Sequence, residues 1–303
     1  MYRFKNILSE LNLDEADKAV AQYTGLFANL TKAESVIFSH IKEHIYAREE
    51  LAIDDDVLLP TQEEVAAEKI RDIIADNYHS YQGTKTELLV KEGHQLKSLL
   101  GQIKDHEIDL VIVGREPHSP TSRKLPVKLA RKAPCSVLII PEYAPSTIKR
   151  VVVPIDFSHH AKDAVKMAIE IAIAQHLAQI TLLHLFKLPT GYSKNGKSED
   201  EFCIIMKQNA LEEYNDFIED INFKGVDVVF HIAHDEHLGL GILQEMKRQR
   251  ADLIVVGARG RHAGAGVLMG SVTEHLIQRS PIPVLAVKDK DKGMTFFEAI
   301  LQL

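Results

Sequence analysis

The sequence has few of the features that mark a secreted, membrane-spanning or nucleic-acid-binding protein. Its 303 residues include only two cysteines, Cys135 and Cys203, without a C-x-x-C motif, which argues against a disulfide framework and a cysteine-based zinc site. No apolar run approaches the roughly 18 residues of a membrane span, and the N-terminus lacks the apolar stretch of a signal peptide. A net charge of −7 without a long basic run gives no electrostatic footprint for nucleic acid. We therefore expect a cytoplasmic protein without nucleic-acid or membrane partners.

Catalytic motifs are also scarce. No Ser-His-Asp or Cys-His arrangement, and no pair of carboxylates at a recognisable spacing, makes a case for hydrolysis or general acid–base catalysis. The chain does have the composition of a soluble globular protein, with 45% hydrophobic and 26% charged residues, and enough length for two domains. The sequence therefore predicts two globular domains and leaves open whether either is an enzyme.

Strand-like and helix-like segments alternate along the chain and then repeat in the same order. The repeat has a period of about 145 residues, and residues 109–114 (DLVIVG) match residues 252–257 (DLIVVG). Self-similarity at this period indicates a duplicated domain. We predict one domain over residues 1–143, a second over 148–290, and a C-terminal tail over 291–303 that docks on the protein or on another copy. Strands are predicted at residues 7–12, 35–41, 86–90, 110–113, 137–140, 151–155, 180–186, 227–232, 253–256 and 283–287.

The alternation of buried strands and helices predicts the fold class. Each half should be a doubly wound, Rossmann-like α/β domain with a five-stranded, mostly parallel sheet covered on both faces. In such sheets, ligands bind at the carboxyl ends of the strands, where the strand order reverses. The turn after Ile155, the strand end at Leu185 and the loop from Gly257 would meet there in the second half.

The loop that begins at Gly257 is rich in glycine. Gly257, Gly260 and Gly270 with Ser271 have the spacing G-x2-G-x9-G-S, which differs from the dinucleotide fingerprint G-x-G-x-x-G. Glycine lets the backbone approach a ligand closely, and amides at the start of the following helix attract anions. Ser271 and Glu274 have the spacing of a capping box. This order of strand, glycine loop and helix predicts a phosphate cradle; the alternative is a flexible connecting loop.

The spacing G-x2-G-x9-G-S, followed by Val272 and Thr273, resembles the ATP-binding branch of the universal stress protein family. The resemblance extends to residues 151–158 (VVVPIDFS), 182–185 (LLHL) and the closing strand 283–287, and so covers about half of the chain. It implies the adenine nucleotide alpha hydrolase-like fold of that family. It also implies that ATP or another adenine nucleotide, with Mg²⁺, binds in the second half.

The candidate nucleotide-binding residues surround this motif. Asp156 offers a carboxylate to a ribose hydroxyl or to Mg²⁺, with capping of the next helix as the alternative. The resemblance implies that the backbone at Leu185 contacts adenine, although Leu185 also suits a core position. Arg259 and Arg261 would add positive charge or, alternatively, be solvated loop residues. The predicted set is Pro154, Ile155, Asp156, Ser158, Leu185, Val256, Gly257, Arg259, Gly260, Gly270, Ser271, Val272 and Thr273.

The first half departs from this pattern. Glu10 and Asn12 stand where the second half has Pro154 and Asp156. The loop after Gly114 lacks the second and third glycines and contains prolines, which remove amide donors. We expect this half to be a structural partner without an ATP site. The alternative is a different anion, held by Arg115, Arg123 and Lys124.

Residues 191–198 (GYSKNGKS) satisfy the P-loop expression G-x4-G-K-[ST] and follow a predicted strand. However, residues 187–190 separate that strand from the first glycine, and the acidic residues 199–201 would repel a phosphate. Ser198 and Glu201 also have the spacing of an ordinary capping box. The motif therefore predicts either a phosphotransfer enzyme that uses Lys197, or a loop from which Lys194 or Lys197 reaches a nucleotide in the glycine cradle.

Three histidines, His231, His234 and His237, recur at intervals of three residues. Neighbouring imidazoles can bind zinc, with Asp235 or His184 as an added ligand. His231 falls in a predicted strand and the other two in a loop, and the chain has 15 histidines in all. The alternative is therefore a chance cluster of solvated or hydrogen-bonded histidines.

These features together predict a tandem universal stress protein that regulates rather than catalyses. Any ATP hydrolysis would be slow, because no residue stands out as a base that activates water. The resemblance implies that two family domains pair through their last strands, so the two halves could pair within the chain, and two chains could form a homodimer. The competing predictions are a P-loop phosphotransfer enzyme and an interaction protein that binds no nucleotide.

Overall fold

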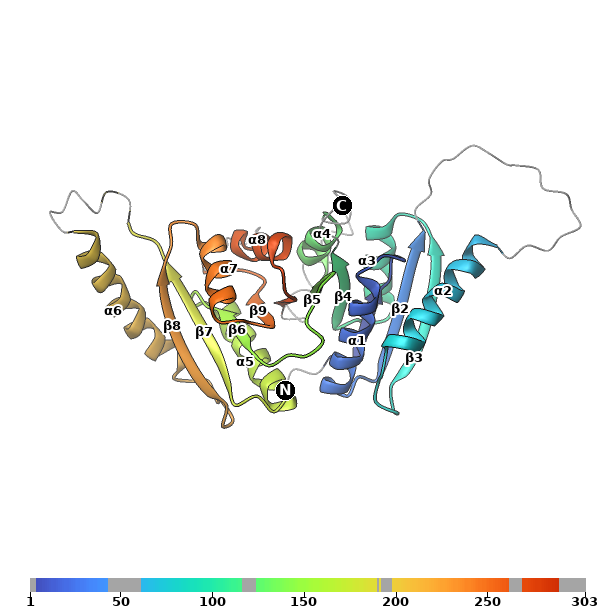
Figure 1. Cartoon of the computed structure of the whole chain (residues 1–303), viewed down its shortest axis with the longest axis horizontal. Coiled ribbons are helices and arrows are strands. Elements are labelled where there is room, and N and C mark those ends of the chain that lie inside the picture. The colour runs from blue at the N-terminus through green and yellow to red at the C-terminus, as the bar shows by residue number, and fades with distance from the viewer. Residues whose placement is uncertain are drawn as a thin grey trace, which may run out of the picture.

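The computed structural model describes residues 4–42, 61–115, 124–189, 191, 198–261 and 269–288. In these residues each half forms a parallel sheet with helices on both faces, which confirms the predicted fold class (Figure 1). The first half runs β1 (Asn6–Glu10), α1 (Asp17–Thr31), β2 (Ser35–Lys42), α2 (Gln62–Asn77), β3 (Lys85–Glu92), α3 (Gln95–Asp105), β4 (Leu110–Arg115), α4 (Lys124–Lys132) and β5 (Ser136–Pro141). The second runs β6 (Val151–Pro154), α5 (His159–Ala174), β7 (Gln179–Phe186), α6 (Glu199–Ile218), β8 (Asp227–His234), α7 (Leu238–Arg248), β9 (Leu253–Gly257), α8 (Ser271–Arg279) and β10 (Val284–Val287).

The strands of both halves join in one continuous sheet of order β3-β2-β1-β4-β5-β10-β9-β6-β7-β8. Within each half neighbouring strands are parallel, and at the centre β5 and β10 pair antiparallel, with Leu138 opposite Leu285. The order reverses at β1, between β2 and β4, and at β6, between β7 and β9. The carboxyl ends of β1 and β6 are therefore the places where such sheets bind ligands.

The duplication extends to details of the backbone. A non-glycine residue with positive φ follows β1 and β6, at Leu13 (60°) and Phe157 (60°). Asp109 accepts hydrogen bonds from two amides that precede or begin β1, and Asp252 accepts two from the residues before β6, at 2.9 to 3.0 Å. Equivalent positions thus perform the same structural task in both halves, which supports a comparison of their ligand sites position by position.

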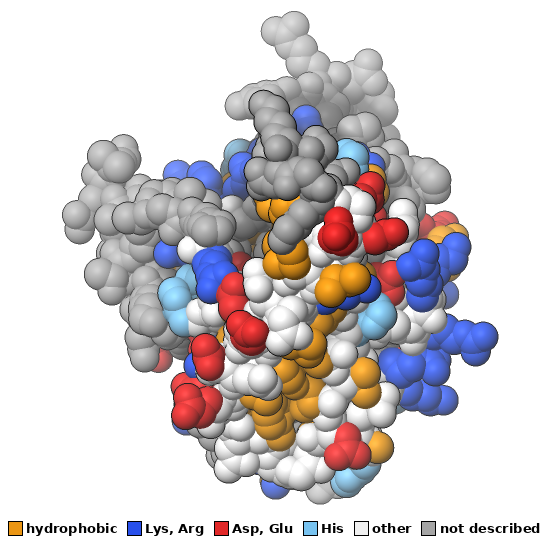
Figure 2. Space-filling model, turned by 90° about the vertical axis from the view of Figure 1, so that its left-hand side faces the viewer, with side chains coloured by type: hydrophobic (Ala, Val, Ile, Leu, Met, Phe, Trp, Pro, Cys, Tyr) orange, Lys and Arg blue, Asp and Glu red, His pale blue; other side chains and the backbone are white. Residues whose placement is uncertain are grey.

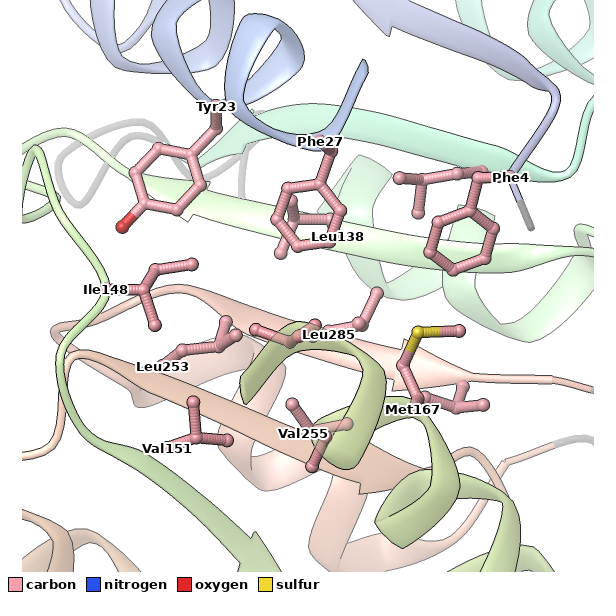
Figure 3. Close-up of a cluster of buried hydrophobic side chains, with 14 of the residues drawn as sticks. Phe4, Tyr23, Phe27, Leu138, Ile148, Val151, Met167, Leu253, Val255 and Leu285 are labelled. Carbon is pink, nitrogen blue, oxygen red and sulfur yellow. The ribbon is translucent and has the colours of Figure 1, made fainter. Parts of the chain in front are cut away.

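The hydrophobic core is continuous across the two halves. On one face of the sheet, Tyr23 and Phe27 of α1 lie opposite Met167 of α5, with Leu138 and Leu285 of the paired strands between them (Figure 3). A second cluster on the other face contains buried side chains of α3, α4, α7 and α8. Burying one such apolar side chain contributes about 1.5 to 3 kcal/mol, so the contact between the halves is part of what stabilises each of them.

Helix α4 is the element that the sequence pattern does not predict. Pro126 lies in its first turn, where the missing amide leaves no hydrogen bond unmade. Leu125 and Leu129, one turn apart, are buried. The stretch is short and highly charged, so its helical form depends on packing against the sheet and against α8.

The outer end of the second half is formed by α6 and β8. Figure 2 shows a band of hydrophobic side chains on this end, bordered by acidic side chains on one side and basic side chains on the other. Helix α6 fully buries only Ala210 and Phe217, and Ile204 remains 67% exposed. None of the helices in the described part of the chain combines the length and apolar character needed to span a membrane.

Candidate functional site

A pocket of about 650 Å³ opens at the carboxyl ends of β6, β7 and β9, where the sheet order reverses. Its lining includes every residue of the predicted nucleotide-binding set except Ser158. Its walls also include residues that the sequence did not point to, which are Ala161, Leu238, Ile242 and Met269. Leu238 and Ile242 lie one turn apart at the start of α7, so the apolar i, i+4 spacing after β8 was the available signal.

The N-terminus of α8 forms one wall of the pocket. The hydrogen-bond ladder of α8 begins with the amide of Glu274, which donates to Gly270 O at 3.0 Å, so the amides of Ser271, Val272 and Thr273 precede it. The predicted capping box is wrong. The N-cap is Gly270, without a side-chain cap, and the carboxylate of Glu274 pairs with Arg131 instead. The first residues of α8 line the pocket, so its positive end, which no side chain caps, faces the pocket.

Asp156 holds the turn after β6 and the glycine loop together. Its Oδ1 accepts from the amide of Ser158 at 3.1 Å and from the Ser158 hydroxyl at 2.6 Å. Its Oδ2 accepts from the amide of Arg261 at 2.7 Å. The N-cap of α5 is Ser158, whose Oγ accepts from Ala161 N, so the alternative role of Asp156 as the cap is wrong. A carboxylate has about four acceptor positions, which leaves room for a further donor or cation in the pocket.

The strand end at Leu185 exposes backbone to the pocket. Leu183 O accepts from Ile155 N at 2.9 Å, so the backbone groups of Leu183 face β6. Alternate residues of a strand point their backbone groups to the same side, and Leu185 therefore also faces β6, which has already ended at Pro154. Leu185 is 8% exposed and its side chain belongs to the core, as the alternative interpretation expects, while a contact of its backbone with adenine stays a prediction.

His184 lies in the pocket wall beside Leu185. Its Nδ1–H donates to Ile155 O at 3.0 Å, and its ring stacks on Phe157 with 4.5 Å between centroids. Burial lowers the pKa of His184, so the neutral imidazole is favoured. His184 is thus a structural support for the turn after β6.

The equivalent place in the first half is filled by polar side chains. Gln95, the first residue of α3, takes the position of Leu238 and donates from Nε2 to Glu10 Oε1 at 2.6 Å and to Asn12 Oδ1 at 2.8 Å. Glu10 is fully buried, and burial raises its pKa to about 8. This cluster gives the first half a different site from the second.

Of the predicted anion ligands in the first half, Arg115 is not available. Arg115 is 7% exposed, and its guanidinium donates to the backbone carbonyls of Ile277 and Ser280 in the second half. Arg123 lies outside the described residues, and Lys124 is exposed at the start of α4. The alternative anion site is therefore contradicted at its first residue.

Lys194, Lys197 and most of the P-loop-like segment lie outside the described residues, as does the tail 291–303. Ser198 is described, and it forms a complete capping box for α6. Its Oγ accepts from Glu201 N at 3.2 Å, and its own amide donates to Glu201 Oε2 at 2.7 Å. The last residue of the motif thus has an ordinary structural role.

The structure does not gather the three histidines. His231 and His234 both lie on β8, but three residues apart on a strand they point to opposite faces. His231 Nε2 bonds Glu245 Oε2 of α7 at 3.0 Å, whereas His234 Nδ1 lies 3.9 Å from Cys203 Sγ of α6. His237 is the residue before α7. Among the described residues there is no group of three or more histidine, cysteine or acidic side chains arranged to hold a metal ion.

A second hollow, of about 730 Å³, lies over β6, β7 and β8 near the C-terminus of α7. Glu245, its acidic side chain, already bonds both His231 and Arg248. It lacks the helix N-terminus and the glycine loop that distinguish the first pocket. The first pocket is therefore the better candidate for a functional site.

Fold and site together define a tandem α/β protein with a helix N-terminus and a glycine loop facing a pocket in one half. The model of the universal stress protein family matches residues 3–141 and 147–288. The chain belongs to the universal stress protein family, with two tandem domains of that family.

Individual relatives agree with this assignment. The chain is 31% identical over 161 residues to universal stress protein MJ0577 of Methanocaldococcus jannaschii, an alignment that covers 47% of this chain and 96% of that protein. Among solved structures, a functionally unknown protein from Pseudomonas aeruginosa aligns with a TM-score of 0.66 at 14% identity, covering 99% of this chain and 98% of that one. A universal stress protein from Archaeoglobus fulgidus aligns with a TM-score of 0.59 at 18% identity, covering 95% and 97%. These two structures share the fold over nearly the whole length.

Proposed function

We propose that this protein is a stress-response regulator that binds ATP or another adenine nucleotide in the pocket of its second half. The observation that carries the proposal is the uncapped N-terminus of α8 beside Gly257, Gly260 and Gly270 in one pocket wall. Backbone amides and the positive end of a helix attract phosphate groups. Mg²⁺ would be held by Asp156 together with the phosphates, because this ion prefers oxygen ligands.

The lining of the pocket also suits a nucleobase. Leu238, Ile242 and Met269 add apolar side chains to it, and the backbone of Leu185 faces the pocket beyond the end of β6. An aromatic base would bury its faces against the apolar side chains and exchange hydrogen bonds with the strand backbone. The lining thus offers both the amides that suit phosphates and the apolar side chains that suit a base.

The first half acts in this proposal as a partner domain. The Glu10, Asn12 and Gln95 cluster occupies the positions that Pro154, Asp156 and Leu238 hold in the second half, so the carboxylate of Asp156 and the apolar side chain of Leu238 have no counterpart there. The two halves pair through β5 and β10, so each chain already contains a pair of domains. A homodimer of whole chains would have to use another surface.

Thermal unfolding with and without Mg-ATP tests the proposal. At a concentration well above Kd, a ligand that binds only the folded state should raise Tm on the order of 5 °C. Gly270→Val should abolish the shift, because its methyl groups would extend toward Gly260 N and Thr273 Oγ1, which lie 3.5 and 3.7 Å from a β-carbon at this position. Gly270→Ala is the matched control and should retain the shift, since those distances are ordinary contacts for one methyl group.

Two outcomes would contradict the proposal. Loss of the shift in Lys197→Ala but not in Gly270→Val would favour the P-loop phosphotransfer enzyme. Absence of a shift in the folded wild-type chain would favour an interaction protein that binds no nucleotide.

A further inference from the structure

Helix α8 touches the pocket with one end and the first half of the chain with the other. Arg115, the last residue of β4, donates from Nη1 to the carbonyl oxygen of Ile277 at 2.6 Å and from Nη2 to that of Ser280. The carbonyls in the last turn of a helix have no partner within the helix, and this end carries the negative pole of the helix dipole. A buried cation from the first half therefore caps α8 from the side opposite the pocket.

A second contact ties the start of α8 to the same half. Arg131 of α4 forms an ion pair with Glu274, which lies in the first turn of α8 and lines the pocket. Helices α4 and α8 also pack against each other. The first half thus holds α8 at its pocket end as well as at its far end.

A residue of the second half likewise caps a helix of the first half, α4, which contributes no residue to the lining of the pocket. Lys288, which follows β10, donates from Nζ to the carbonyl oxygens of Ala133 at 2.6 Å and Arg131 at 3.3 Å, at the C-terminus of α4. Each half therefore caps the last helix of the other with a cation. Only the cap on α8 holds a helix that lines the pocket, because α8 contributes its first four residues to the lining and α4 contributes none.

We infer that Arg115 is a positioning residue for the pocket of the second half, and that the first half controls the affinity of that pocket through α8. This inference rests on the proposed function. Helix α8 has nine residues and is too short to be stable alone, so its position depends on what holds its ends. Releasing its C-terminus lets the amides of Ser271, Val272 and Thr273 move out of register with a bound phosphate. The first half is in this way a regulator of the cradle in the second half.

The test compares two full-length variants, Arg115→Met and Lys288→Met, by calorimetric titration with Mg-ATP. Both remove a cationic cap at the contact between the halves, and both should lower the unfolding midpoint. Only Arg115→Met should weaken nucleotide binding, by about fivefold or more, a typical size for coupling between sites. Equal weakening in both variants, or unchanged affinity in Arg115→Met, would overturn the inference.

Hydrogen exchange in the absence of nucleotide separates this inference from the proposed function. Arg115→Met should speed exchange along all of α8, including the paired amide of Glu274 at the pocket end, whereas Lys288→Met should leave these amides unchanged. Faster exchange confined to the last turn would show a local structural role only and would overturn the inference. If wild-type protein binds no Mg-ATP, the proposed function fails, and the exchange result still decides whether the first half holds the pocket end of α8.

Discussion

Replacing Gly257 with alanine should lower the free energy of unfolding by about 3 kcal/mol, the upper part of the usual range for overpacking. A β-carbon at this position would lie 2.7 Å from His160 O and 2.8 Å from His160 C. These are backbone atoms in the first turn of α5, and they cannot move away unless β9 and α5 separate. The expected loss is measured by urea unfolding of the full-length variant.

Gly114 supplies the matched control, because it occupies the same place at the end of β4. A β-carbon there would lie 3.0 Å from Ala16 Cβ and 3.4 Å from Val20 Cγ2, which are side-chain methyl groups. Gly114→Ala should therefore cost about 1 kcal/mol, because these contacts are longer than those at Gly257 and are relieved by a shift of a few tenths of an ångström. Equal losses in the two variants would contradict the explanation by close approach of the backbone.

In the Glu10→Gln variant, the fall in stability between about pH 5 and pH 8 expected of the wild-type protein should disappear. Burial, together with the nearby carboxylates of Asp17 and Asp14, raises the pKa of Glu10 to about 8. Between the ordinary value of 4.5 and about 8, the folded chain holds a proton that the unfolded chain has released. Stability therefore decreases with rising pH across this window, by up to about 1.4 kcal/mol per pH unit.

The measurement is the urea midpoint of wild type and Glu10→Gln at several values between pH 4.5 and pH 8.5. The variant should match wild type near pH 4.5 and exceed its free energy of unfolding at pH 8 by about 3 to 5 kcal/mol. Glu87→Gln, at an exposed position on β3, serves as the control and should follow the wild-type pH dependence. A variant that parallels wild type at every pH would show that Glu10 keeps an ordinary pKa in the folded state.

Much of the fold follows from local pattern. Short continuous apolar runs that end in glycine, such as residues 253–256, indicate buried strands, and their repetition at a fixed period predicts two copies of one doubly wound sheet. The positions lining the pocket could also be anticipated, because parallel strands place their carboxyl ends at one edge whatever the remaining contacts are. The strands and the pocket positions could be predicted because they depend on the periodicity of short segments and on the order of those segments along the chain.

The roles of individual side chains depended on contacts between distant parts of the chain. Arg115 follows a strand in the first half, and nothing near it in sequence indicates that it caps α8, 162 residues away. Gln95 looks like an ordinary helix residue until the fold places it against Glu10 and Asn12. His231 and His234 appear to be a cluster in sequence, yet the alternation of a strand sends them to opposite faces. Local sequence thus specifies which elements form and where their ends meet. Hydrogen-bond partners and burial arise only when the elements pack, because the energies of hydrogen bonding and of burial depend on neighbours from the whole chain.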